Sequence, residues 1–122
     1  MSVKIIIVDD HKIMRDGLRT LLEKEKGLEV IAEAKNGRET IQLAEQLRPD
    51  IIIMDISMDD LNGMDATRQI VAKEWGCRII ALSMHADKRF VTGMLDAGAS
   101  GYLLKDCAFS ELADAIRATA QG

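Results

Sequence analysis

Apolar residues along this chain come in short runs that are separated by longer stretches of helical spacing. The runs predict strands, and they cover residues 5–8, 28–33, 51–54, 79–82 and 102–104. Continuously apolar runs are typical of strands that are buried on both faces of a parallel sheet covered by helices. The run at residues 28–33 partly alternates between apolar and polar positions, which suits an edge strand.

Between these runs, apolar residues recur at the spacing of one helix face. The helical sets fall within residues 14–22, 41–47, 64–71, 90–95 and 112–120. Local signals agree, because Asn36-Gly37 is typical of a helix start, and Gly98 and Gly101 flank the turn into the last strand. The regular alternation predicts an α/β domain, a doubly wound five-stranded parallel sheet of (βα)5 type.

Polar residues stand at the carboxyl ends of four of the five predicted strands. Asp9 and Asp10 follow the first run, Asp55 follows the third, Ser83 ends the fourth and Lys105 follows the fifth. Doubly wound sheets bind their ligands beyond this edge, near the switch point. We therefore expect these side chains to line one site.

The residue types in this set indicate phosphoryl chemistry. Three converging carboxylates repel one another, and a hard divalent cation such as Mg2+ relieves the repulsion. A metal ion, a lysine and a hydroxyl together neutralise a transferring phosphoryl group, and a carboxylate can accept it as an aspartyl phosphate. Asp9 and Asp10 are adjacent and resemble a metal pair. Asp55 stands alone at the end of the central run and is the better candidate for the nucleophile.

Each of these residues also has a simpler interpretation when it is taken alone. Asp10 could cap the helix that begins near His11, and Asp55 could be a turn residue. Ser83 could be a structural cap, and Lys105 could be a solvated surface charge. His11 itself is expected to be a surface residue at the helix start. The joint pattern on one edge favours the shared site.

Length and charge narrow the class of protein. The 122 residues suffice for one domain, and the net charge of −4 argues against a DNA-binding or membrane-binding surface. No apolar run reaches 18 residues and no leader pattern precedes the first strand, so a cytoplasmic location is expected. Cys77 and Cys107 lack CxxC spacing and are expected to be reduced thiols.

Several short motifs resemble one known family. They are Val-Asp-Asp-His at residues 8–11, the run around Asp55 at residues 53–58, Asn-Gly at 62–63, Leu-Ser at 82–83, and Gly-Ala-Ser-Gly-Tyr-Leu-Leu-Lys at 98–105. Together they resemble CheY-like receiver domains of two-component response regulators, especially those of NarL/FixJ (LuxR-type) transcriptional regulators. The resemblance extends from about residue 3 to residue 120 and implies the strand order 2-1-3-4-5.

The resemblance also implies roles for individual residues. Asp55 matches the phosphoryl acceptor, and Lys105 matches the lysine that pairs with the phosphoryl group. Asp10 and Asp55, with the backbone carbonyl of Ser57, match the direct Mg2+ ligands, whereas Asp9 matches a carboxylate that acts through a metal-bound water.

A switch and a set of partners follow from the same resemblance. Ser83 matches the switch hydroxyl and Tyr102 the switch aromatic, although Tyr102 alone could be a half-buried aromatic of an edge strand. Phosphorylation by a sensor histidine kinase would reshape the face formed by the fourth helix, the fifth strand and the fifth helix. The implied output is transcription regulation through a helix-turn-helix domain that follows residue 122, with homodimer formation on phosphorylation; a stand-alone receiver is the alternative. Such a domain is not an enzyme, although it assists its own phosphorylation and dephosphorylation.

Other functions of this architecture fit the residues less well. A Mg2+-dependent aspartyl-phosphate hydrolase would usually carry a second Asp at the position of Ser57, and a flavin-binding domain would need a phosphate-cradling loop where Asp9 and Asp10 stand. A receiver that never takes phosphate would be expected to have lost part of the set.

Two positions depart from the family or vary within it. Asp106 replaces a common Pro after Lys105, which predicts a trans bond, and His85 is either a partner of the phosphoryl group or an exposed loop residue.

Overall fold

Strands and helices alternate along the whole described part of the chain. The computed structural model describes residues 2–55, 63–83, 88–105 and 109–121, apart from the side chain of Phe90. Within these ranges the elements are β1 (Val3–Val8), α1 (Lys12–Glu23), β2 (Leu28–Ala34), α2 (Gly37–Leu47), β3 (Ile51–Asp55), α3 (Gly63–Ala72), β4 (Arg78–Ser83), α4 (Lys88–Asp96), β5 (Gly101–Leu104) and α5 (Phe109–Gln121). Each predicted strand and helix is confirmed.

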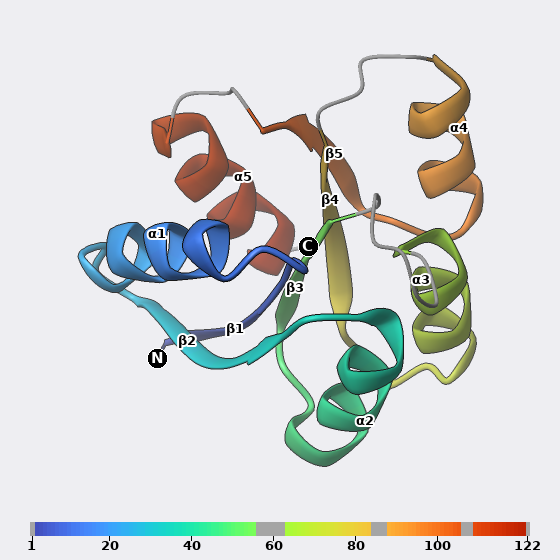
Figure 1. Cartoon of the computed structure of the whole chain (residues 1–122), viewed down its shortest axis with the longest axis horizontal. Helices are drawn as coiled ribbons and strands as arrows, with labels where there is room; N and C mark the ends of the chain where they lie inside the picture. The colour runs from blue at the N-terminus through green and yellow to red at the C-terminus, as the bar shows by residue number, and fades with distance from the viewer. Residues whose placement is uncertain (1, 56–62, 84–87, 106–108, 122) are drawn as a thin grey trace.

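The strands form one parallel sheet in the order β2-β1-β3-β4-β5. This is the predicted order, with β2 at an edge as its partial alternation indicated. Helices α1 and α5 cover one face of the sheet, and α2, α3 and α4 cover the other (Figure 1). The chain reverses direction along the sheet between β1 and β3, so the carboxyl ends of these two strands flank the switch point.

The central strands are buried on both faces, which explains their continuously apolar sequences. Ile6 and Ile52 lie in the cluster beneath α2, α3 and α4, whereas Ile5, Ile7 and Ile53 lie in the cluster beneath α1 and α5. All five side chains are at most 1% exposed. Burying one such side chain contributes about 1.5–3 kcal/mol, so these residues help to hold β1 and β3, which carry the candidate site.

Some apolar residues assigned to helix faces are partly exposed. The exposed ones are Leu21, Leu47, Val71 and Leu95, at 42%, 42%, 37% and 50%. In three of these helices the neighbouring residue, Leu22, Ile70 or Met94, is fully buried. Successive residues are about 100° apart around a helix, so of two adjacent apolar residues one often lies at the margin of the buried face.

The pairing of β1 with β2 contains an irregularity. Ile5 lies opposite Val30, but the next residue, Ile6, lies opposite Ala32. The extra residue reverses which face of β2 the following side chains occupy, since side chains alternate along a strand. Glu33 is thereby placed opposite Ile7, on the face that α1 covers.

The start of α2 shows how local chemistry fixes an element. The side chain of Asn36 accepts a hydrogen bond from the backbone N–H of Glu39 at 2.8 Å, and Glu39 in turn accepts from the backbone N–H of Lys35 at 3.2 Å. The first bond satisfies an amide group that the first helical turn leaves without a partner, and the second ties the residue before the N-cap to that turn. The Asn36-Gly37 signal for a helix start is therefore confirmed.

Gly98, in the turn between α4 and β5, has a backbone conformation that excludes other residues. Its φ is +108°, and an added Cβ would lie 2.8 Å from a methyl carbon of Val71. We expect Gly98→Ala to lower the free energy of unfolding by about 2 kcal/mol, through backbone strain and overpacking. Gly17→Ala is the matched control, because Gly17 lies inside α1 and an added Cβ would meet nothing within 4 Å apart from its chain neighbours and the backbone of its own helix. It should stabilise by roughly 0.5–1 kcal/mol. Urea unfolding would measure both, and an unchanged midpoint for Gly98→Ala would contradict the proposed strain.

Candidate functional site

The acidic residues predicted to converge do lie together at the carboxyl ends of β1 and β3. Asp9 directly follows β1 and Asp55 is the last residue of β3, and both side chains are 2% exposed. The side chain of Asp10 is 31% exposed. One carboxylate oxygen from each of these residues and one ring nitrogen of His11 all lie within 4.8 Å of one another. Asp55 is a buried strand residue, so the alternative that it is a turn residue is wrong.

Lys105 brings a positive charge into the same site from the end of β5. Its Nζ donates to Oδ2 of Asp9 at 3.1 Å and lies 3.4 Å from Oδ2 of Asp55, and its side chain is only 7% exposed. Its backbone N–H donates to the carbonyl of Ser83 at 2.7 Å. The alternative of a solvated surface lysine is wrong, because two strand ends hold this side chain against two carboxylates.

The charge state of Lys105 follows from two opposing effects. Burial lowers the pKa of the ammonium, but attraction by Asp55 and the hydrogen bond to Asp9 outweigh burial and leave the pKa raised. The group therefore stays positively charged at neutral pH. It can balance one of the neighbouring carboxylates.

The turn between β1 and α1 is organised by Asp9 and His11. His11 is the N-cap residue of α1 but makes no side-chain cap bond, and its backbone N–H donates to Oδ1 of Asp9 at 2.9 Å. Its Nδ1 lies 3.1 Å from Oδ1 of Asp9 and 2.8 Å from Oδ1 of Asp10. Asp10 is thus not the cap of this helix, and that alternative is wrong.

Ser83 and Tyr102, the residues matched to a switch, lie on neighbouring strands. Ser83 is the last residue of β4 and is fully buried, while Tyr102 lies on β5 opposite Ala81 and is partly buried against the cluster beneath α2, α3 and α4. Because β5 is an edge strand, the simpler interpretation of Tyr102 as a half-buried edge aromatic describes its position correctly. Its role as a switch stays a prediction.

Some predicted features fall outside the described residues. These are the backbone carbonyl of Ser57, the side chain of His85 and the peptide bond between Lys105 and Asp106. The fourth proposed metal ligand and the expected trans bond therefore stay predictions.

Two residues of the site were not identified from the sequence as contacting it. His11 was expected to be a surface residue, and its side chain is indeed 74% exposed, but it also contacts both neighbouring carboxylates. The position of His11 directly after Asp9 and Asp10 was the sequence signal that could have indicated this contact. Arg15 donates from Nη1 to the backbone carbonyl of Asp9 at 2.6 Å. A bond to a backbone atom leaves no motif, so the sequence offered no comparable signal for Arg15.

The electrostatics of the cluster favour a divalent cation. Three carboxyl groups share the site with one ammonium, and two of the three, Asp9 and Asp55, are buried, so the repulsion between carboxylates is only partly balanced. The donors are mainly carboxylate oxygens, which suit a hard cation such as Mg2+ better than a thiolate-seeking or imidazole-seeking metal. Asp9, Asp10 and Asp55 are thus chemically suited to hold such an ion.

No helix among the described residues is long and apolar enough to span a membrane.

Comparisons with known proteins agree with this geometry. The family described as "Response regulator receiver domain" matches residues 5–117. The transcriptional regulatory protein DegU of Brevibacillus brevis is 39% identical over 99% of this chain and 51% of its own length. The transcriptional regulatory protein LiaR of Bacillus subtilis (strain 168) is 41% identical over 98% of this chain and 57% of its own length. The chain thus spans little more than half the length of these relatives.

Solved structures show the same likeness. A LuxR-family two-component response regulator from Aurantimonas sp. SI85-9A1 superposes with a TM-score of 0.95 at 38% identity, covering 100% of this chain and 87% of that one. The signal receiver domain of the putative response regulator NarL from Mycobacterium tuberculosis has a TM-score of 0.95 at 28% identity, covering 99% and 98%.

Proposed function

The chain belongs to the response regulator receiver family, and on this basis we propose that it acts in phosphorelay signalling by accepting a phosphoryl group on Asp55, with Mg2+ bound beside it. The donor is a sensor histidine kinase. The observation that carries the proposal is the buried contact of Lys105 with both Asp9 and Asp55 at the carboxyl edge of the sheet.

Each residue of the cluster has a part in the proposed chemistry. Asp10 and Asp55, with the backbone carbonyl of Ser57, would hold Mg2+, and Asp9 would act on it through a water molecule. When bound, Mg2+ neutralises charge on the phosphoryl oxygens. A carboxylate oxygen of Asp55 forms the new bond to phosphorus as the bond from phosphorus to the kinase histidine breaks. Lys105 stays charged near neutral pH and pairs with the phosphoryl group.

The proposed output is a change of shape at the β5 edge of the sheet. A phosphoryl group on Asp55 adds nearly two negative charges and three acceptor oxygens. Ser83 would turn toward them, Tyr102 would turn inward, and the face made by α4, β5 and α5 would switch. In this proposal the domain is a phosphoacceptor switch that assists its own phosphorylation and dephosphorylation.

The proposal extends to the protein in which this domain works. We propose that residues 1–122 are the N-terminal receiver of a longer cytoplasmic regulator, whose helix-turn-helix domain binds DNA and which dimerises on phosphorylation. This is supported by the greater length of DegU and LiaR, which are named transcriptional regulatory proteins. The net charge of −4 agrees with DNA contact being made elsewhere.

Mass spectrometry tests the central step. After incubation with Mg2+ and acetyl phosphate, the protein should gain the mass of one phosphoryl group, which alkali removes. Asp55→Asn should gain nothing, and removal of Mg2+ with EDTA should prevent the gain in the unaltered chain. Modification on another residue, or none despite bound Mg2+, would refute the assignment of Asp55. Sustained hydrolysis of a phosphate ester without a trapped phosphoprotein would instead favour the aspartyl-phosphate hydrolase.

A further inference from the structure

Arg15 of α1 connects the acidic site to the edge strand β2. Its Nη1 donates to the backbone carbonyl of Asp9 at 2.6 Å, and its Nε pairs with Oε1 of Glu33 at 3.2 Å. The Arg15 and Glu33 side chains are only 15% and 20% exposed, so this is a mostly buried ion pair and not a loose surface contact. A guanidinium presents several donors in a rigid plane, which allows it to hold a carboxylate and a carbonyl together.

The irregularity in β2 makes this contact possible. With uninterrupted alternation from Val30, Glu33 would point to the face of the sheet that α2, α3 and α4 cover. The extra residue between Val30 and Ala32 turns Glu33 to the face that α1 covers. Irregularities of this kind often redirect a side chain beside a functional site.

Both backbone groups of Asp9 are consequently tied to β2. Its N–H donates to the carbonyl of Ala34 at 3.1 Å, and its carbonyl accepts from Arg15, which Glu33 holds in place. A peptide group is planar, so fixing the Asp9 carbonyl also fixes the N–H and Cα of Asp10. The direction in which Asp10 presents its carboxylate therefore depends on Arg15.

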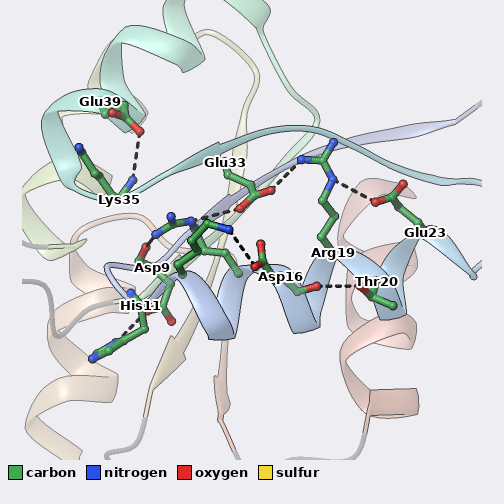
Figure 2. A network of polar contacts seen from close by, with 11 residues as sticks. Asp9, His11, Asp16, Arg19, Thr20, Glu23, Glu33, Lys35 and Glu39 are labelled. Carbon is green, nitrogen blue, oxygen red and sulfur yellow. Dashed lines mark hydrogen bonds and ion pairs between the residues drawn. The ribbon is translucent and has the colours of Figure 1, made fainter.

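A second arginine on the same glutamate provides an internal comparison. Arg19, one turn further along α1, donates from Nη1 to Oε2 of Glu33 at 2.7 Å and from Nε to Glu23 at 3.0 Å (Figure 2). Arg19 carries the same charge as Arg15 and shares Glu33 as a partner, but its other ion pair is with Glu23 and not with Asp9. It stabilises the position of Glu33 without touching the turn that carries the acidic pair.

We propose that Arg15 is a positioning residue for Mg2+: it orients the Asp9–Asp10 peptide so that Asp10 faces Asp55. The inference rests on the proposed function, because it assumes that this cluster binds Mg2+. Charge and positioning predict opposite changes in Mg2+ affinity when Arg15 is replaced. Removing a positive charge near a cation site removes Coulomb repulsion, and this effect alone should tighten cation binding. If Arg15 acts by positioning, removing it should weaken binding.

Isothermal titration of the unphosphorylated protein with MgCl2 separates these effects. Arg15→Met should raise the Mg2+ Kd roughly tenfold, the low end of what losing the partner of a metal-site residue costs. Arg19→Met, the matched control, should leave the Kd unchanged or slightly lower it. The carbonyl 13C chemical shift of Asp9, measured without Mg2+, should move in Arg15→Met and stay constant in Arg19→Met. A general loss of stability would not produce this pattern.

Arg15→Lys provides the test if Arg15→Met fails to fold. It keeps the charge but cannot hold both Glu33 and the carbonyl with one plane of donors, so the Kd should rise roughly threefold. A Kd at or below that of the unaltered protein in the folded variant would overturn the positioning role while leaving Asp55 phosphorylation intact. Absence of Mg2+ binding in the unaltered protein would overturn both proposals.

Discussion

Replacing Lys105 with methionine should destabilise the metal-free protein by about 3–5 kcal/mol, the usual cost of leaving a buried charge without its partner. The ammonium lies against Asp9 and Asp55, whose side chains are 2% exposed. Methionine matches the length and volume of the lysine stem, so the effect isolates the charge. Urea unfolding in EDTA measures it. The same variant should also take up phosphoryl groups from acetyl phosphate more slowly, because the charge that pairs with the transferring group is gone.

Mg2+ should reverse much of that loss of stability. A divalent ion bound among the carboxylates supplies the positive charge that the variant lacks, so adding MgCl2 should raise the melting temperature of Lys105→Met more than that of the unaltered protein. Lys12→Met is the matched control, because Lys12 pairs with Asp16 on the surface, with side chains 78% and 55% exposed. It should change stability by less than about 0.5 kcal/mol. Equal Mg2+ shifts in all three proteins would contradict the idea that Lys105 and the ion balance the same carboxylates.

The pH dependence of the Lys105 contribution has a definite sign. The pKa of Lys105 is raised in the folded protein, because Asp55 and Asp9 outweigh the opposing effect of burial. The resulting stabilisation is fully present below the ordinary lysine pKa of about 10.4 and is lost as pH rises through the higher folded value. The gap in stability between Lys105→Met and the unaltered protein should therefore be constant from neutral pH to about pH 10 and narrow only in stronger alkali.

The sequence predicted the sheet and the convergence of its acidic residues because both depend on short-range patterns. Continuously apolar runs indicated buried strands, and parallel strands necessarily bring their carboxyl ends to one edge, so Asp9 and Asp55 could be placed together without coordinates. The contact from Arg15 could not be predicted in this way. It depends on a single extra residue in β2 that reverses the face of Glu33, and strand alternation read from the sequence would have put that glutamate on the wrong side.

The different burial and different partners of Asp9 and Asp10 could not be predicted from the sequence either. Asp9 and Asp10 are identical residues in adjacent positions, and only the resemblance assigned them different roles. In the structure, Asp9 is buried against Lys105 and accepts a backbone bond from His11, whereas Asp10 is 31% exposed and lies 2.8 Å from the ring of His11. The turn geometry gives Asp9 a buried lysine and a backbone N–H as partners, whereas the partner of Asp10 is the exposed ring of His11.

This asymmetry predicts opposite effects on stability for two matched substitutions. Asp9→Asn weakens the pairing with Lys105 and should destabilise the metal-free protein by about 1–3 kcal/mol. Asp10→Asn removes one of three clustered negative charges without disturbing Lys105, and should stabilise it by about 1 kcal/mol. Both should raise the Mg2+ Kd by roughly tenfold or more, since each removes a charge from the site.

Thermal unfolding with and without Mg2+ distinguishes these outcomes in one experiment. In EDTA the melting temperature of Asp10→Asn should lie above that of the unaltered protein and that of Asp9→Asn below it. In excess MgCl2 the advantage of Asp10→Asn should shrink or vanish, because the ion relieves the same repulsion in the unaltered protein and binds it more tightly. If Asp10→Asn destabilises the metal-free protein as much as Asp9→Asn does, the carboxylates do not repel one another strongly enough to require a cation. Mg2+ binding at this site would then not be driven by relief of that repulsion.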